Sequence, residues 1–260
     1  MTQIEKGFAI PVLDHGHVIY VDHLGDDHAI CAAARVSYNK ADVVKTPEDD
    51  QRLINRLYRD HHTSPFEMGK IVFNIKMPIF VARQYIRHRM QNVNEVSARY
   101  TALPDEFYIP KQWRKQDTKN KQGGLIAYDW EKPGGTEPSI SQMMTDKLQL
   151  HCHDAYLLYK ELLDYGVERG MARMVLPLNI YTELRACWDL KNLLHFIRLR
   201  EDTHAQAEIQ EYGRAMKQIL GALFPMVLAA YERYQIRAHT EPEVMRPTSS
   251  EWVEKGVWQP

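Results

Sequence analysis

The stretch Lys70–Met77 constrains the fold more than any other, because its side chains alternate in a way that suits an extended strand. Ile71, Phe73 and Ile75 fall on one face of an extended chain, and the residues between them fall on the other. A period of two is typical of a strand with one buried face. Pro78 follows at once and suits a helix start, so the sequence predicts a half-buried strand that runs directly into a helix.

Capping residues mark further helices. Asp26 and Asp27 can cap a helix that runs through three alanines and ends near Ser37, and Thr46 followed by Pro47 is a typical helix start. The remaining expected elements are one or two strands over 8–22, a helix that Ser141 caps and Gly166 closes, a short helix over 169–175, a strand over 178–188, a helix that Asp189 caps, and a helix from about 205 to 234 that is bent at Pro225.

The order of these elements argues for a mixed α/β fold. Strands and helices do not alternate regularly, and the fingerprints Gly-x-Gly-x-x-Gly and Gly-x4-Gly-Lys are missing, so a doubly wound nucleotide fold is not expected. A central sheet with flanking helices is expected instead, and 44% hydrophobic residues suffice for its core. We expect one domain over 1–235, with a glycine- and lysine-rich loop insertion at about 111–141, and a C-terminal tail over 236–260.

Charge and hydropathy argue against two classes of partner, nucleic acid polymers and membranes. The net charge is −1, from 33 basic and 34 acidic residues, so the charge of the whole chain does not favour a nucleic acid polymer. No apolar run approaches the roughly 18 residues of a membrane span, and the first residues lack the pattern of a secretory signal. We therefore expect a cytoplasmic protein without membrane association.

Cysteines and histidines do not form a recognisable metal or disulfide pattern. Cys31, Cys152 and Cys187 are widely spaced in apolar surroundings and are expected to be reduced core residues. The paired histidines at 15/17 and 151/153 lack a third ligand at diagnostic spacing. No metal site is expected.

The segment Arg87–Tyr100 has the highest concentration of charged and hydrogen-bonding side chains that could bind a ligand. It holds three arginines, a histidine, a carboxylate and a hydroxyl. The basic groups can neutralise a phosphate through charge-assisted hydrogen bonds, while the acceptor and donor suit a polar ring or ribose, so a nucleotide is indicated. The alternative is a solvated basic helix face followed by a polar turn. Gln84 and Arg87 would share one face of the preceding helix and could reach one ligand.

The spacing within this segment resembles the defining motif of the flavin-dependent thymidylate synthases, Arg-His-Arg followed by seven residues and a serine. Arg87, His88, Arg89 and Ser97 match it, and Ala98–Tyr100 follows. The further matching segments, in order, are Ala34–Ser37, Ser64–Glu67, Pro78–Gln84, Leu176–Asn179, Leu199–Arg200 and Thr203–Gln210. The resemblance covers roughly residues 30–108 and 142–232, and several motifs in one order are more specific than any single motif.

The resemblance implies an enzyme that makes dTMP from dUMP by reductive methylation. In this family 5,10-methylenetetrahydrofolate supplies the carbon and is released as tetrahydrofolate, while NADPH reduces a bound FAD that supplies the hydride. The cofactors do the difficult chemistry, and the protein stacks flavin, pyrimidine and folate and tunes the charge around them. The resemblance also implies the family's fold and a homotetramer with active sites at subunit interfaces.

The dUMP site follows from the matching positions. Arg200 resembles the arginine that contacts uracil and favours loss of the N3 proton, so it is expected to be the catalytic residue. Ser97 invites assignment as a nucleophile, but no base stands beside it in the sequence, so a ligand role is expected. Arg173 is expected to reach the site from another subunit. The residues expected to bind dUMP are Gln84, Tyr85, Arg87, Glu95, Val96, Ser97, Ala98, Arg99, Arg173 and Arg200.

A second set of matching positions is expected to bind FAD. Asp189 and Lys191 stand where the family often has Asn and Arg, which replaces a neutral amide by a carboxylate and a forked donor by a point charge. His62 matches a histidine near the flavin ring and the folate site, with His61 beside it as an alternative imidazole. The expected FAD set is Ser37, Ser64, Arg87, His88, Arg89, Glu95, Asp189, Lys191 and His195.

Two alternative functions remain open in addition to the enzyme. A catalytically silent relative that binds flavin or nucleotide is motivated by Asn92, which replaces a serine common in the motif, and by Asp189 and Lys191. A nucleic-acid-binding protein would use the basic cluster from Arg83 to Arg99 and would lose affinity steeply with salt. The overall charge does not support this last interpretation.

Overall fold

A five-stranded antiparallel sheet forms the centre of the molecule. The computed structural model describes residues 4–41, 43–117, 124–126 and 139–240. The strand order is β1-β2-β3-β7-β4, and neighbouring strands pair antiparallel. The bounds are β1 Ala9–Val12, β2 Gly16–Leu24, β3 Lys70–Pro78, β4 Asn92–Glu95 and β7 Tyr181–Asp189. The prediction of a mixed α/β fold that is not doubly wound is confirmed.

Strand β3 lies between β2 and β7 and has the buried face that the sequence predicted. Ile71, Phe73 and Ile75 are completely buried. Phe73 is paired with Ala186 of β7, which is also completely buried. Burying each large apolar side chain stabilises the fold by roughly 1.5–3 kcal/mol. This alternation therefore fixes the register at the centre of the sheet.

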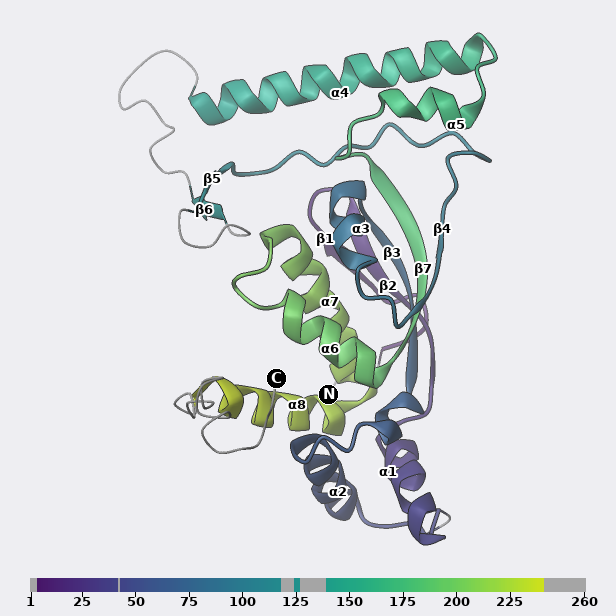
Figure 1. The fold of residues 1–260 in the computed structure, drawn as a ribbon, viewed down its shortest axis with the longest axis vertical. Helices are drawn as coiled ribbons and strands as arrows, with labels where there is room; N and C mark the ends of the chain where they lie inside the picture. The colour runs from purple at the N-terminus through teal and green to yellow at the C-terminus, as the bar shows by residue number, and fades with distance from the viewer. Residues whose placement is uncertain (1–3, 42, 118–123, 127–138, 241–260) are drawn as a thin grey trace, which may run out of the picture.

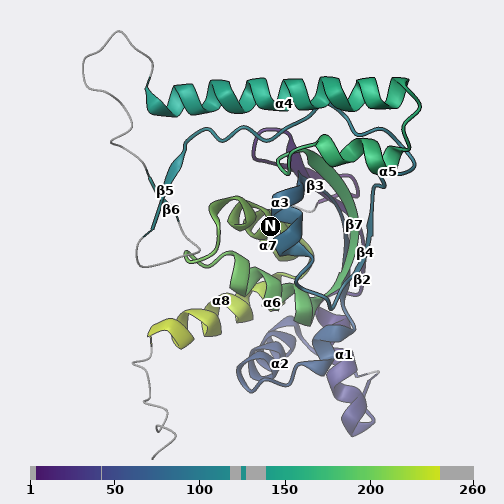
Figure 2. The same ribbon diagram turned by 45° about the horizontal axis from the view of Figure 1, so that its top comes forward.

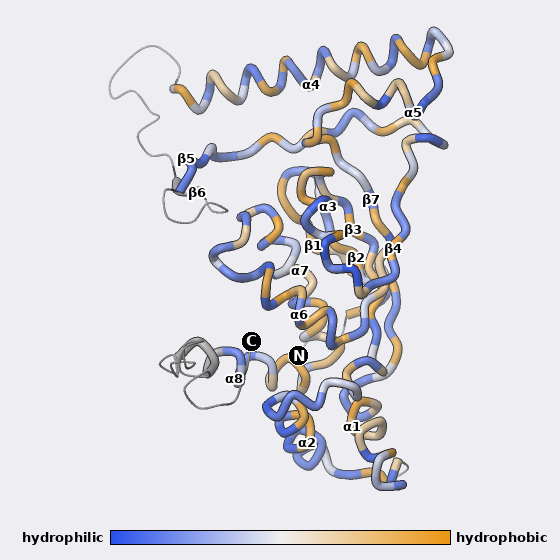
Figure 3. The backbone as a smooth tube through the Cα atoms, in the orientation of Figure 1, coloured by the Kyte–Doolittle hydropathy of each residue, from blue (hydrophilic) through white to orange (hydrophobic). Residues whose placement is uncertain are grey.

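Helices cover one face of the sheet. In Figures 1 and 2, α6 and α7 lie on one side of the strands, while α1, α2 and α8 gather at one end. The bounds are α1 Asp27–Arg35, η1 Val36–Tyr38, α2 Pro47–Arg59, η2 Ser64–Glu67, α6 Leu190–Arg200, α7 Ala207–Leu223 and α8 Pro225–Thr240. Figure 3 shows hydrophobic and hydrophilic residues interspersed along these helices, as expected for helices with one buried face. The predicted caps Asp26, Thr46 and Asp189 are confirmed, because each side chain accepts a backbone N–H of the first turn.

A long helix lies apart from this core, along the top of Figure 1. The bounds here are α4 Ile140–Asp164, α5 Arg169–Ala172 and the 3₁₀ turn η4 Arg173–Val175. Ser139 caps α4, so the predicted cap at Ser141 is wrong by two residues. After the helix Gly166 has a φ of 79°, which glycine adopts without strain and which confirms the predicted stop. Ala98, Phe107 and Cys152 belong to a small second apolar cluster that α4 helps to form.

The single bent helix predicted from about 205 to 234 is wrong. α7 ends at Leu223, Phe224 has non-helical angles of φ −131° and ψ 66°, and α8 begins at Pro225. Proline disfavours a helical conformation for the residue before it, so the chain breaks here instead of bending. α8 continues to Thr240, across the expected boundary between domain and tail, and that division stays a prediction.

The secondary structure around Arg87–Tyr100 differs from the prediction. The helix after Pro78, α3 Ile79–Tyr85, ends before Arg87, so Gln84 and Arg87 do not share a helix face. β4 then follows, in a segment for which the sequence predicted no strand. β7 begins later than the predicted 178, because the carbonyls of residues 178 and 180 accept N–H groups at the start of α3.

Part of the predicted loop insertion at 111–141 is a two-stranded hairpin. β5 Arg114–Gln116 pairs antiparallel with β6 Gly124–Ile126, while 118–123 and 127–138 lie outside the described residues. The three cysteines are free thiols, and only Cys187 is partly exposed. Over the described ranges no helix is both long and apolar enough to cross a membrane. The same part of the chain contains no group of three potential metal-binding side chains.

Candidate functional site

Five of the residues expected to bind dUMP line one cavity. This cavity, the loop pocket, has a volume of about 670 Å³ and lies between α3, the segment after β4 and the α5–η4 turn. We call the five residues the loop cluster, and they are Glu95, Val96, Ser97, Ala98 and Arg173. Apolar residues of α3 and of the segment 174–180 complete the walls.

Strand β7 and a tight turn orient the polar side chains of the loop cluster. Thr182 Oγ1 donates to Glu95 Oε1 at 2.7 Å. Ser97 Oγ accepts the backbone N–H of Arg99 at 3.3 Å, and the Ser97 carbonyl accepts the backbone N–H groups of Tyr100 and Thr101. Because the Ser97 hydroxyl acts only as an acceptor here, its own proton is available for a ligand.

Two arginines bring positive charge to the loop pocket. Arg83 and Arg173 both line it and are both exposed. Neither guanidinium has a hydrogen-bond or ion-pair partner among the described residues. Free guanidinium groups at an open cavity suit an anion such as phosphate. Arg173 and Glu95 line this pocket from the same chain, and the expectation that Arg173 reaches Gln84 and Arg87 from another subunit stays a prediction.

A second set of polar side chains lies where α6 and α7 meet. Arg200 Nε donates to His88 Nε2 at 2.9 Å. Gln84 Nε2 donates to Oε1 of Gln206, the residue that precedes α7. We call Gln84, His88 and Arg200 the helix cluster. Its side chains are half-buried, and each is bonded to another residue of the same chain.

Burial sets the protonation of the helix cluster. Burial first, and then the positive charge of Arg200, lower the pKa of His88 to about 4. The imidazole is therefore neutral at pH 7, and Nε2 can accept the hydrogen bond from Arg200. Burial also lowers the pKa of Arg200, but a guanidinium stays charged at any working pH. The cluster thus places a permanent cation against a neutral ring.

Helix α3 separates the two clusters. Ala82, Arg83 and the residues one turn away from them face the loop pocket, whereas Gln84 turns toward α7. In Figure 2, α3 lies between α7 and the strands β7 and β4. The lining of the loop pocket includes no member of the helix cluster. The two clusters therefore do not form one cavity within a single chain.

The other residues expected to bind dUMP are more scattered. Tyr85 is fully buried and its hydroxyl accepts Trp188 Nε1 at 2.6 Å, so its side chain belongs to the core. Arg87 is exposed, and its Nε donates to the carbonyl of Arg83 at 3.1 Å. Arg99 lines a separate cavity of about 400 Å³ beside the end of α4. The structure does not bring these three side chains into the loop pocket.

Some residues of the expected FAD set lie around another cavity. Arg89 and Asp189 line this cavity of about 290 Å³ together with Lys70 and Gln91. Gln91 Oε1 is buried and lacks a hydrogen-bond partner within the described residues. These residues fit a flavin nucleotide, since Arg89 and Lys70 can pair with phosphate and Gln91 Oε1 can accept a ribose hydroxyl.

Asp189 and Lys191, the two residues that differ from the family pattern, both bond to other residues of the same chain. Asp189 accepts both the backbone N–H and the side-chain amide of Asn192, at 2.9 and 2.7 Å, and so caps α6. Lys191 Nζ forms an ion pair with Glu67 at 2.5 Å. Both charges therefore already have partners in η2 or α6.

The remaining residues of the expected FAD and folate sets are exposed. Ser37 lies in η1, His62 and Ser64 lie at the start of η2, and η2 packs against α6. The His195 ring on α6 lies 6.0 Å from the His88 ring, measured between centroids. The exposed side chains of His62, Ser64 and His195 are accessible to a ligand near η2 and α6, whereas Ser37 lies in η1, which packs against α1.

Comparison with known proteins identifies the family. A family model described as thymidylate synthase complementing protein matches residues 20–226. A flavin-dependent thymidylate synthase from Thermus thermophilus is 46% identical over 231 residues, which cover 89% of this chain and 81% of that protein. Another, from Wolbachia pipientis wMel, is 46% identical over 86% of this chain and 76% of its own length. The chain belongs to the flavin-dependent thymidylate synthases.

Solved structures agree with the fold of this flavin-dependent thymidylate synthase. The UMP/dUMP methylase PolB from Streptomyces cacaoi, solved with 5-Br dUMP, has a TM-score of 0.75 and 29% identity over 86% of this chain and 98% of its own. The same methylase with 5-Br UMP has a TM-score of 0.74 and 28% identity. The family resemblance and the fold expected from the sequence are confirmed.

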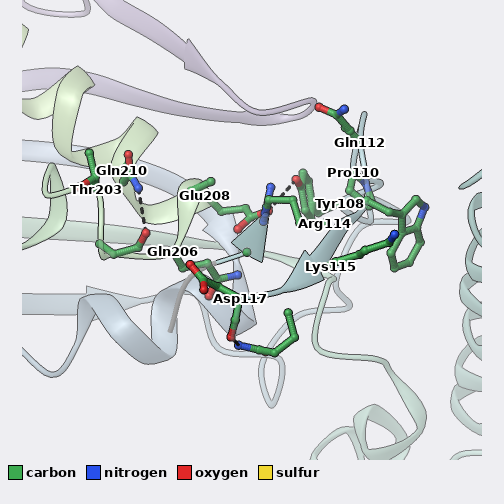
Figure 4. A pocket seen from close by; sticks show the side chains of 15 residues that line it. Tyr108, Pro110, Gln112, Arg114, Lys115, Asp117, Thr203, Gln206, Glu208 and Gln210 are labelled. Carbon is green, nitrogen blue, oxygen red and sulfur yellow. Dashed lines mark hydrogen bonds and ion pairs between the residues drawn. The ribbon is translucent and has the colours of Figure 1, made fainter. Parts of the chain in front are cut away.

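This flavin-dependent thymidylate synthase also has a cavity that the sequence did not predict. Figure 4 shows this cavity, the hairpin pocket, of about 480 Å³ between the β5–β6 hairpin and the start of α7. Glu208 is 3% exposed, and its Oε1 accepts the Tyr108 hydroxyl at 3.1 Å and Arg114 Nη2. Burial opposes the charge of Glu208, but Arg114 outweighs it and keeps the pKa of Glu208 below its usual value. The sequence does show a glutamate in the first turn of a helix, but such a glutamate is usually solvent-exposed, so it did not indicate a buried ion pair.

Proposed function

We propose that this protein converts dUMP to dTMP, with FAD as its flavin, 5,10-methylenetetrahydrofolate as carbon donor and NADPH as reductant, and that it releases tetrahydrofolate. Family membership supports the reaction, as does the likeness to a methylase named for UMP and dUMP. The observation that carries the proposal is the bond between Arg200 and neutral His88, because it holds a permanent cation in a half-buried place.

The loop cluster would bind the phosphate and ribose of dUMP. Arg173 and Arg83 can form charge-assisted hydrogen bonds with phosphate, and the Ser97 hydroxyl can donate to it. Glu95 is oriented by Thr182 and can accept a ribose hydroxyl or a ring N–H. This assignment retains Glu95–Ala98 and Arg173 as ligands, with Arg99 at the edge of the turn.

Arg200 would act on the uracil ring. Loss of the N3 proton leaves negative charge on the ring and its carbonyl oxygens, and a fixed guanidinium stabilises that charge without reorganising. Gln84, held by Gln206 beside it, can hydrogen-bond the ring edge. Arg200 is therefore the residue to which we assign catalysis.

Ser97 would be a ligand and not a nucleophile. A serine needs a neighbouring base to attack carbon, and the lining of the loop pocket contains no histidine or lysine. Its oxygen instead accepts the N–H of Arg99. The hydroxyl proton is then directed away from the turn, toward a bound anion.

Residues near η2 and the start of α6 would hold FAD. Arg89 can bind its phosphates, with Ser37, Ser64, Arg87, His88, Glu95, Asp189, Lys191 and His195 as further contacts and His62 near the ring. When bound, the flavin supplies the hydride that the methylation requires. Asp189 and Lys191 would contact it only while keeping their bonds to Asn192 and Glu67.

Two copies of the chain would build each active site, within a homotetramer. Within one chain α3 separates the loop cluster from the helix cluster. A symmetric contact between two chains can bring the loop cluster of one to the helix cluster of the other, and forms two equivalent sites at once.

The direct test is to purify the protein, record its visible spectrum, and follow NADPH oxidation with and without dUMP before adding 5,10-methylenetetrahydrofolate and assaying dTMP. Flavin absorbance and dTMP formation are expected. Bound flavin without dTMP would contradict the proposal and favour a silent relative, the interpretation that the internal bonds of Asp189 and Lys191 support.

A further inference from the structure

The contact between His88 and Arg200 gives the histidine a role beyond the flavin contact that its motif implies. Arg200 Nε donates to His88 Nε2 at 2.9 Å, across 112 residues of sequence. A guanidinium has five N–H donors in a rigid, planar fork. Fixing Nε therefore fixes the plane of the whole group and leaves the Nη donors for another partner.

The imidazole is itself held by the core. Its centroid lies 4.9 Å from that of Phe196 in an edge-on contact, and 6.3 Å from that of Trp188. Phe196 and Trp188 are 0% and 1% exposed. The His88 carbonyl also accepts Gln91 Nε2 at 2.8 Å. The ring thus connects the position of Arg200 to side chains that do not move easily.

Without this bond nothing comparable would orient the guanidinium. Within the described residues, the side chain of Arg200 has no hydrogen-bond or ion-pair partner other than His88. Arginine has high rotamer entropy, and a displacement of about 1 Å in a reacting group can cost 10²-fold in rate. A half-buried arginine that must meet a flat ring therefore requires a support.

We propose that His88 is a positioning residue for Arg200, and that its Nε2 lone pair orients the guanidinium toward the uracil of dUMP. This inference rests on the proposed role of Arg200. It assigns to the histidine of the Arg87–Arg89 triplet a function in the methylation step that is separate from flavin binding.

Two substitutions of His88 distinguish the effect of its hydrogen-bond acceptor from the effect of the space that its side chain fills. His88→Gln places an amide oxygen close to the site of Nε2 and can still accept from Arg200, whereas His88→Leu fills similar space without an acceptor. We expect His88→Leu to lower kcat at saturating dUMP by about 10- to 100-fold with nearly normal flavin content. His88→Gln is expected to recover most of the rate. Equal losses in both variants, or parallel loss of flavin, would overturn the proposal.

A double mutant of His88 and Arg200 provides a second test of the proposal. In an Arg200→Ala background, His88→Leu is expected to cause no further loss of turnover or dUMP affinity, because the histidine then has nothing to position. Additive losses would contradict the inference.

The bond itself can be tested without turnover, by NMR titration of His88. Arg200→Ala is expected to raise the pKa of His88, because a neighbouring positive charge is removed. An unchanged pKa of His88 would show that the contact is absent and would overturn the inference. Normal turnover of Arg200→Ala, by contrast, would overturn the proposed function of Arg200, so the two failures are distinguishable.

Discussion

The loop cluster and the helix cluster differ in how tightly the chain holds them. In the loop cluster, the guanidinium of Arg173 is exposed and has no partner in the described part of the chain. In the helix cluster, Gln84 and Arg200 are half-buried and bonded to Gln206 and His88. Binding a phosphate requires charge within reach, whereas stabilising charge on a ring requires fixed geometry. Under the proposed function, the loop cluster would supply affinity for dUMP and the helix cluster would supply the chemistry.

The largest effect is expected from Arg200→Ala. Removing an oriented donor to a developing charge should lower kcat by about 10²- to 10³-fold, while flavin content stays near normal. Steady-state dTMP formation and the flavin spectrum measure the two quantities. Arg214→Ala, an exposed arginine paired with Glu211 on α7, is the control. Near-normal turnover of Arg200→Ala would remove the chemical role from the helix cluster.

Arg114→Leu tests whether the hairpin supports the start of α7. It leaves Glu208 buried without its cation, which should lower the free energy of unfolding at pH 7 by about 3 kcal/mol. Because the pKa of Glu208 is depressed, the pair stabilises the native protein above the ordinary pKa of 4.5, and this contribution is lost as the pH falls through the native pKa.

The destabilisation by Arg114→Leu should consequently shrink toward pH 4, and Arg114→Leu/Glu208→Gln should recover part of the loss. Denaturant unfolding at both pH values provides the measurement. A constant difference between wild type and Arg114→Leu would contradict this account of the pair.

Arg173→Ala should change affinity more than chemistry. Loss of hydrogen bonds to a charged phosphate costs about 1.5–3 kcal/mol, so KM for dUMP should rise about 10- to 100-fold with a smaller change in kcat. Arg52→Ala, on the exposed side of α2, is the matched control. A fall in kcat at unchanged KM would reverse the roles of the two clusters.

The smallest effect is expected from Ser97→Ala. Loss of one hydroxyl donor should weaken dUMP binding about fivefold, equivalent to roughly 1 kcal/mol, with chemistry retained at saturating dUMP. Isothermal titration and single-turnover rates separate these quantities. Complete loss of chemistry would revive Ser97 as a nucleophile.

Local patterns in the sequence predicted the central elements but not the contacts between them. The alternation over Lys70–Met77 and the caps at Asp26 and Thr46 depend on neighbouring residues, and the structure confirms them. β4 was missed because Asn92–Glu95 is an exposed strand without apolar alternation. The Arg114–Glu208 pair spans 94 residues, so no local pattern could indicate it.

The motif assigns its residues to one expected site, but it does not predict on which side of α3 each side chain lies. Arg-His-Arg and Ser97 look like one continuous unit in the sequence. In the structure, His88 turns toward Arg200, while Ser97 turns into the loop pocket beyond α3. A resemblance carries residue identities, whereas the side of a helix that each residue faces depends on tertiary packing.

The central claim is that the loop cluster of one copy completes the helix cluster of another. Arg200→Ala and Arg173→Ala, each impaired alone, should be co-expressed with different tags, isolated as mixed oligomers, and assayed for dTMP at low dUMP. If the account is correct, activity recovers, because each mixed pair contains one site with both arginines intact. If both clusters of a site came from one chain, every site would lack an arginine, and the mixed oligomers would be as inactive as the parent variants.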